Sequence, residues 1–296
     1  MSLMQFSPNY FYQIYSEKIQ TDFQVPYLEP SISEKKSLTF KASSKVKNCT
    51  NKNFFNLNLD KGIYCKKDQL KVSLDNNIRY QILNKKISNT DLSFKLFTHP
   101  MGLYLFQKGN FVLHSSAINI GGKGFIFMGL SGAGKSSVIG SLINHGVLIT
   151  EDISKINFDG DSAFISPSLP IIKLSKDIFN FHSFETVGDF DIAGDQRNRK
   201  GYIVKNFDEN NAPVKISGCF ILDGKNSKEI QKVDSDFAFR NLLMNSFSAI
   251  PKNQCKESEK MLLNNISSFI ENVPIYNLPR QKNFSNKLIF DFFSKC

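Results

Sequence analysis

One stretch of the chain combines glycines, a lysine and a hydroxyl in a spacing that can hold phosphate. Residues 129–136 read Gly-Leu-Ser-Gly-Ala-Gly-Lys-Ser. This is a glycine, four residues, and then Gly-Lys-Ser. In this pattern backbone N–H groups surround the phosphates, Lys135 reaches the outer phosphates, and the Ser136 hydroxyl ligates magnesium. The residues that we expect at the bound molecule are Gly129, Ser131, Gly132, Ala133, Gly134, Lys135, Ser136 and Ser137.

The segments on either side of the loop agree with this prediction. Residues 124–128 read as a buried strand, and residues 137–143 read as a helix with an apolar stripe. A glycine loop between them places unpaired N–H groups and the positive end of the helix dipole at one point, where an anion is favoured. The alternative is an ordinary tight turn, which would not need all the identities of the motif.

A second group that could do chemistry is a pair of adjacent carboxylates. The apolar segment 147–150 ends directly in Glu151 and Asp152. Carboxylates in this place would lie beside magnesium and the terminal phosphate. Successive strand residues point to opposite faces, so a regular strand would turn only one of them toward the phosphates. We expect Asp152 to bind magnesium and Glu151 to act as the base. The opposite assignment stays open, as does a plain surface position for Glu151.

His114 is the third candidate. It lies in the strand-like segment 111–120, and Gly121-Gly122 is expected to turn the chain into the strand that feeds the loop. This path would bring His114 near the phosphates, where an imidazole can donate to phosphate or move a proton. The alternative is a hydrogen-bonded histidine of the core.

Composition limits the classes of function. The 296 residues include 37 Lys and Arg, and the net charge is +10. The basic residues form no block of five or six, so we expect a solvated surface and no nucleic-acid partner. The five cysteines are odd in number and form no CxxC pair, and no run of about 18 apolar residues occurs. We therefore expect a cytoplasmic protein with no membrane contact.

The elements that position these residues fall into two predicted domains. Residues 1–90 are expected to form a β-rich domain, because short alternating runs at 55–59, 62–65, 70–74 and 79–83 predict an antiparallel meander. Residues 91–296 would hold the phosphate loop. A helix is expected to begin with Asp91 as its N-cap, and Pro100 is expected to kink or split it. The loop helix should stop at His145-Gly146, with Gly146 as its C′ residue.

Further elements are expected after the acids. A hairpin should turn at Asp159-Gly160 within 156–165, and 171–174 should be an edge or crossing strand. The polar, glycine-punctuated region 185–201 is predicted to be a mobile loop. Strands are expected at 202–204 and 214–222, and helices at 236–248, 256–271 and 285–295.

Three segments, 113–117, 129–137 and 146–152, occur in an order that resembles the HPr kinase/phosphorylase-like kinases. The resemblance covers roughly residues 100–220. It implies an α/β core of the phosphoenolpyruvate carboxykinase/HPr kinase type, a P-loop core with a mixed sheet and flanking helices, here joined to a β-rich N-terminal domain. It further implies an ATP- and Mg²⁺-dependent kinase that transfers the γ-phosphoryl to a hydroxyl. In some members the product is also cleaved by phosphorolysis.

The same resemblance assigns residues. It places His114 near the reacting phosphate, and Glu151 where the family commonly has an aspartate that acts as the base. Glutamate keeps the charge and reaches one methylene further. Arg197, Arg199 and Lys200 correspond to basic residues on a loop that approaches the phosphates; a solvated charged face is the alternative.

The acceptor is left open between the serine of a protein and a small molecule, because the N-terminal domain differs from that of the carrier-protein enzymes. Relatives form oligomers, so a homo-oligomer is an expected partner state. Two other functions stay open. One is a nucleotide hydrolase or carboxykinase-like enzyme on the same core. The other is a catalytically weak nucleotide-binding sensor or interaction protein.

Overall fold

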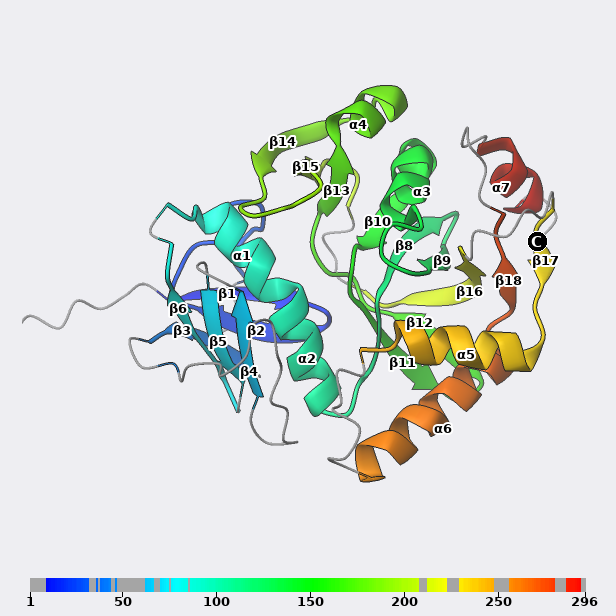
Figure 1. Ribbon diagram of the computed structural model, residues 1–296, viewed down its shortest axis with the longest axis horizontal. Helices are drawn as coiled ribbons and strands as arrows, with labels where there is room; N and C mark the ends of the chain where they lie inside the picture. The colour runs from blue at the N-terminus through cyan, green and yellow to red at the C-terminus, as the bar shows by residue number, and fades with distance from the viewer. Residues whose placement is uncertain are drawn as a thin grey trace, which may run out of the picture. The chain divides into compact units, whose positions relative to one another are not determined.

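The chain is a mixed α/β protein with three sheets in its described part (Figure 1). The computed structural model describes residues 9–31, 36, 38–43, 46, 62–66, 70–74, 76–84, 86–207, 212–222, 229–247, 256–279 and 286–293. The chain divides into two compact units. The first is Met1–Lys108 with Ala249–Cys255, and the second is Gly109–Ser248 with Lys256–Cys296. The predicted boundary at residue 90 lies earlier in the chain than this division.

The first unit contains a six-stranded sheet in the order β1-β2-β3-β6-β5-β4. Its strands are β1 (Tyr10–Ile14), β2 (Glu17–Thr21), β3 (Leu38–Ala42), β4 (Gly62–Lys66), β5 (Leu70–Leu74) and β6 (Ile78–Ile82). Strands β4, β5 and β6 pair antiparallel, which confirms the meander over this stretch. In β5 the apolar residues Leu70, Val72 and Leu74 are all fully buried, as the period of two requires. The strand expected at 55–59 lies outside the described residues.

Two helices follow the sheet, α1 (Asn89–Phe97) and α2 (His99–Gln107). The expected N-cap was wrong. Ser88 is the N-cap, and its hydroxyl accepts from the N–H of Asp91 at 3.1 Å, because a serine three residues earlier satisfies that orphan donor. The expected split at Pro100 is confirmed, since Thr98 separates the helices and the proline occupies the first turn of α2. Both helices belong to the first unit.

The second unit is built on a nine-stranded sheet with the path β10-β8-β9-β16-β12-β11-β7 and with β17 and β18 beyond β16. Its strands are β7 (Phe111–Leu113), β8 (Ser115–Ile120), β9 (Lys123–Met128), β10 (Val147–Thr150), β11 (Ser154–Asp159), β12 (Ser162–Ile165), β16 (Val214–Ile221), β17 (Gln231–Lys232) and β18 (Ile275–Asn277). Strand β16 pairs parallel with β9 and with β18, and most other pairs are antiparallel. The sheet is therefore mixed, as predicted.

Helices cover both faces of this sheet. One apolar cluster joins Ile126 and Met128 of β9 to helices α5 (Ser235–Asn245) and α6 (Lys256–Asn272). The alternate residues Phe125 and Phe127 belong to a second cluster with α3 (Lys135–Leu142) and α7 (Asn286–Phe293). Odd and even positions of one strand thus serve opposite layers, which fixes its register. The predicted helix after the loop and the predicted helices at 236–248, 256–271 and 285–295 are confirmed as α3, α5, α6 and α7 (Figure 1).

A separate three-stranded sheet, β13-β15-β14, carries the segments that follow the hairpin. Its strands are β13 (Ile171–Ser175), β14 (Thr186–Asp191) and β15 (Arg199–Val204), and α4 (Lys176–His182) lies between β13 and β14. The prediction of a loop over 185–201 is wrong for most of its length, and only 192–198 connect the strands. In β14 half-buried positions alternate with exposed ones such as Asp189 and Asp191, so its polar residues are those of a half-buried strand.

The loop helix ends differently from the expectation. Its last turn tightens into a short 3₁₀ helix (Ile143–His145), and Gly146 is extended with φ −153° rather than left-handed. Glycine is needed there for space, since a Cβ would lie 2.6 Å from the carbonyl oxygen of Asn119. Strand β10 then begins at Val147, as predicted.

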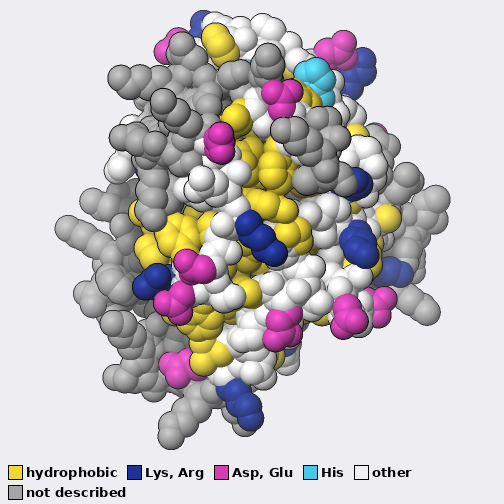
Figure 2. Space-filling model, turned by 90° about the vertical axis from the view of Figure 1, so that its right-hand side faces the viewer, with side chains coloured by type: hydrophobic (Ala, Val, Ile, Leu, Met, Phe, Trp, Pro, Cys, Tyr) yellow, Lys and Arg dark blue, Asp and Glu magenta, His cyan; other side chains and the backbone are white. Residues whose placement is uncertain are grey.

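On the face drawn in Figure 2, basic side chains of the described residues are scattered among acidic and apolar ones and do not gather in one patch. No helix in the described part of the chain is both long and apolar enough to cross a membrane.

Phe220 of β16 offers a test of the core of the second unit. Its ring is fully buried and stacks on Phe127 at 5.2 Å and on Tyr276 at 5.5 Å. Phe220→Ala should lower the free energy of unfolding by about 3–5 kcal/mol, because it removes apolar contacts and leaves a cavity. Phe181, which is 72% exposed, is the matched control, and Phe181→Ala should change it by less than about 0.5 kcal/mol. Urea denaturation of both variants would decide, and equal losses would contradict this packing.

Candidate functional site

The predicted phosphate loop joins the end of β9 to the start of α3. Its glycines have conformations that other residues rarely adopt, with φ +90° at Gly132 and +103° at Gly134. Gly129 is required for space, since a Cβ there would lie 2.7 Å from the carbonyl oxygen of Leu222. The N–H of Ala133 donates back to Leu130 at 3.0 Å and closes a turn. Ser136 and Ser137 follow in the first turn of α3.

Lys135 lies folded against its own loop. The side chain is buried, and its Nζ donates to the carbonyl of Gly129 at 2.8 Å. Burial lowers the pKa of this ammonium, the charge of Glu151 opposes the shift, and the guanidinium groups of Arg197 and Arg199 add to it. An anion bound in the loop would offset those positive charges.

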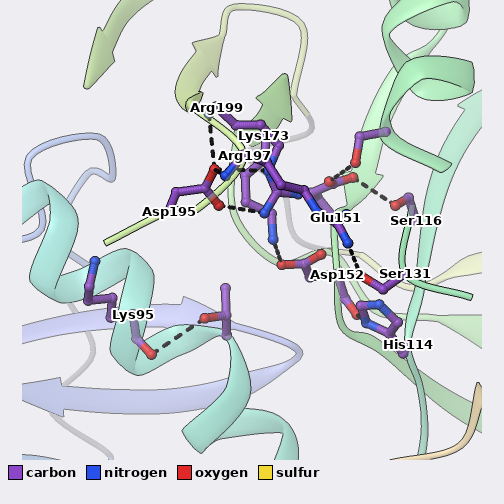
Figure 3. A network of polar contacts seen from close by, with 12 residues as sticks. Lys95, His114, Ser116, Ser131, Glu151, Asp152, Lys173, Asp195, Arg197 and Arg199 are labelled. Atoms are coloured by element: carbon purple, nitrogen blue, oxygen red, sulfur yellow. Dashed lines mark hydrogen bonds and ion pairs between the residues drawn. The ribbon is translucent and has the colours of Figure 1, made fainter. Parts of the chain in front are cut away.

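Glu151 is held by two serines (Figure 3). One carboxylate oxygen accepts from the Ser136 hydroxyl at 2.5 Å, and the other accepts from the Ser116 hydroxyl of β8 at 2.7 Å. Glu151 is only 5% exposed, so the alternative of a surface position is wrong. The contact ties the end of β10 to the residue of the loop that is expected to ligate magnesium.

Asp152 makes different contacts from those of Glu151. The pairing of β10 with β8 is irregular after Leu148, and Asp152 has φ +68°, so the two acids do not simply alternate along a regular strand. The Asp152 carboxylate forms an ion pair with Lys173 of β13, and both side chains are about one-tenth exposed. Its backbone carbonyl lies 3.0 Å from Nδ1 of His114, which can donate in the appropriate tautomer. His114 thus lies beside Asp152 and contacts its backbone, while its predicted place near the phosphates stays a prediction.

Lys173 is the main residue that the sequence reasoning missed. Burial lowers its pKa to about 8, with the carboxylate of Glu151 acting against the shift and the charges of Arg199 and Lys135 reinforcing it. A usable signal was present, because Lys173 interrupts the apolar strand β13. Lysine is almost never buried without a partner.

The basic loop reaches the site in part (Figure 3). The Arg197 guanidinium donates to the Ser131 hydroxyl of the phosphate loop at 3.1 Å and lies 3.7 Å from where a Cβ on Gly132 would be. Arg199 is near enough to act on the charges of Lys135 and Lys173. Lys200 instead pairs with Asp189 of β14.

Asp195 fixes the shape of this loop. Burial alone would raise its pKa, but hydrogen bonds from the Arg199 side chain and from the backbone N–H groups of Arg199 and Arg197 outweigh burial and lower it to about 2. The side-chain bond measures 2.6 Å. Asp195 and Ser116 were not predicted as site residues, and both act by orienting another side chain.

The assembled side chains suit a polyphosphate with magnesium. The four cations are Lys135, Lys173, Arg197 and Arg199, and the three carboxylates are Glu151, Asp152 and Asp195. The oxygens of Ser136, Glu151 and Asp152 are hard ligands of the kind that Mg²⁺ prefers. Within the described residues no three or more His, Cys, Asp or Glu side chains come together as a metal site.

Comparisons with known proteins give a distant structural likeness. No protein-family model matches the chain, and no curated protein matches it. Among solved structures the chain is similar to the Hpr(Ser) kinase/phosphatase from Coxiella burnetii, with a TM-score of 0.31 and 12% identity, over 62% of this chain and 97% of that one.

Proposed function

We propose that the protein is an ATP-dependent kinase that transfers the γ-phosphoryl group to a hydroxyl of a protein or a small molecule. The observation that carries the proposal is the contact between Ser136 and Glu151 at 2.5 Å. It joins a glycine loop suited to phosphate with a buried acid at the end of the adjacent strand. This is the pair of parts that phosphoryl transfer on a phosphate loop requires.

The cations supply the electrostatic part of the reaction. The N–H groups of the loop and the Lys135 ammonium would hold the phosphates, and Arg197 and Arg199 would approach from the opposite loop. Lys135 must leave the carbonyl of Gly129, its partner at 2.8 Å, to reach a phosphate. Magnesium, when bound, offsets the charge of the phosphates. Catalysis in such a site depends on positioning, because little covalent chemistry is left to the protein.

The two acids would divide the remaining work. Ser136 contacts Glu151, so we assign Glu151 with Ser136 to the magnesium side, and Asp152 to the acceptor hydroxyl as the base. This is the assignment that the sequence left as the alternative. Asp152 has the required freedom only after Lys173 releases its carboxylate. His114 would hold the backbone of Asp152 in place through its 3.0 Å contact.

Lys135 allows a direct test of the phosphate loop. Lys135→Ala should weaken ATP binding at least about tenfold, because hydrogen bonds to charged groups contribute about 1.5–3 kcal/mol each. Lys123 is the matched control: it begins β9, the strand whose other end enters the loop, and it is exposed. Lys123→Ala should bind ATP like the unmodified protein in a titration with a fluorescent nucleotide. Equal affinities of the two variants would exclude a phosphate site at residues 129–136.

A second comparison separates the roles of the acids. Asp152→Asn should lower the rate of transfer by about 10²–10⁴ and leave ATP affinity unchanged, because a positioned base contributes that much. Glu151→Gln should instead raise the magnesium concentration that gives half-maximal rate. Steady-state rates over a magnesium titration would show both. The reversed pattern would restore Asp152 to magnesium and Glu151 to the base.

The reaction class is tested with labelled ATP, magnesium and candidate hydroxyl acceptors. Label on the acceptor supports the kinase. Release of labelled phosphate without acceptor labelling would identify a hydrolase, and tight nucleotide binding without turnover would identify a sensor. Either of these last results would overturn the proposal.

A further inference from the structure

The ammonium of Lys173 lies against Asp152, one of the two acids of the site. It forms an ion pair with the Asp152 carboxylate, and Glu151 is the other carboxylate whose charge attracts it most strongly. We propose that Lys173 is a tethered cation that keeps divalent metal off Glu151 and Asp152 in the nucleotide-free protein, so that metal enters only together with nucleotide. The proposal rests on the proposed function for the identity of the incoming ligand.

The burial of the pair shows that Lys173 is part of the site. The Lys173 and Asp152 side chains are 11% and 10% exposed, so water solvates neither charge well. Lys173 extends from β13, in the three-stranded sheet, and Asp152 follows β10, at the edge of the nine-stranded sheet. An interaction between two sheets that is this enclosed fixes the ammonium in one place. It therefore supplies Asp152 with a positive charge, as a metal ion on that carboxylate would.

Glu151 is likewise occupied before any ligand arrives. Its oxygens accept from Ser136 and Ser116 at 2.5 and 2.7 Å. A divalent ion would have to displace the Ser136 proton donor and approach an ammonium at Asp152. In the described part of the chain no group of three or more metal-binding side chains compensates for that repulsion. The oxygens of a polyphosphate would provide the missing ligands and the missing negative charge.

Removal of the lysine charge should reverse this balance. Without it, the carboxylates of adjacent residues Glu151 and Asp152 would share a buried region with less positive charge to neutralise them. Two carboxylates in such a region attract a divalent cation, because a Coulomb interaction is several times stronger there than in bulk water. The direction is the opposite of the effect expected for a metal ligand, whose loss weakens metal binding.

The chain contains a matched control in its other unit. Lys95 and Asp91 of α1 also form a buried ion pair, with both side chains 4% exposed. Lys95→Met removes the same chemical group from a similarly enclosed ion pair, at a residue that is not part of the candidate site. A general consequence of deleting a buried lysine, such as loosening of the fold, would appear in both variants. An effect on metal binding that is specific to Lys173 would appear only in the Lys173 variants.

The test measures Mn²⁺ binding to the nucleotide-free protein by electron paramagnetic resonance, which counts the free hydrated ion. The samples are the unmodified protein, Lys173→Met, Lys173→Gln, Lys173→Arg and Lys95→Met, after removal of metal with chelator. Lys173→Met and Lys173→Gln should bind one Mn²⁺ at least about tenfold more tightly than the unmodified protein. Lys173→Arg, which keeps the charge, and Lys95→Met should bind it as weakly as the unmodified protein. Circular dichroism checks that each variant is folded.

Two results would overturn the proposal. One is a folded Lys173→Met or Lys173→Gln variant with the weak Mn²⁺ affinity of the unmodified protein. The other, which needs no variant, is tight Mn²⁺ binding by the unmodified nucleotide-free protein. A separate arm adds a non-hydrolysable ATP analogue, which should make the unmodified protein retain Mn²⁺. Failure of this arm alone would count against the proposed nucleotide function, because the comparison without nucleotide does not depend on it.

Discussion

The site depends on one buried carboxylate. Glu151 accepts hydrogen bonds from Ser116 of β8 and from Ser136 at the start of α3, and so connects three elements that meet beside the phosphate loop. A buried carboxylate is costly unless its oxygens are satisfied, so this arrangement fixes the end of β10 as firmly as it fixes the glutamate.

The second constraint is the balance of charge. Lys135 and Lys173 are both buried, and each feels the positive charge of the basic loop. Two carboxylates offset part of this charge, because Asp152 forms an ion pair with Lys173 and Asp195 forms one with Arg199. Each cation of the site is therefore held by a partner within its own chain. Two of these contacts, Lys173 with Asp152 and Arg199 with Asp195, are ion pairs, and in the proposed function a polyphosphate would replace them.

The layers of the second unit explain how these groups are aligned. The parallel pair β9 and β16 lies inside the mixed sheet, and alternate residues of β9 pack against α5 and α6 on one face and against α3 and α7 on the other. Packing on both faces prevents β9 from sliding or rotating. The loop that follows β9 therefore has a fixed position relative to the end of β10.

The sequence by itself determined the local features: the phosphate-loop pattern, the strand before it, the helix after it, and the acids that follow 147–150. These are set by glycine conformation and by periods of two and 3.6, which act over a few residues. Only the tertiary structure decided which acid meets Ser136, that Lys173 crosses to Asp152, and that Lys200 turns to Asp189. Those contacts join segments far apart in the chain. The strand β14 could not be predicted for the same reason, since its alternation of half-buried and exposed positions exists only once β15 pairs with it.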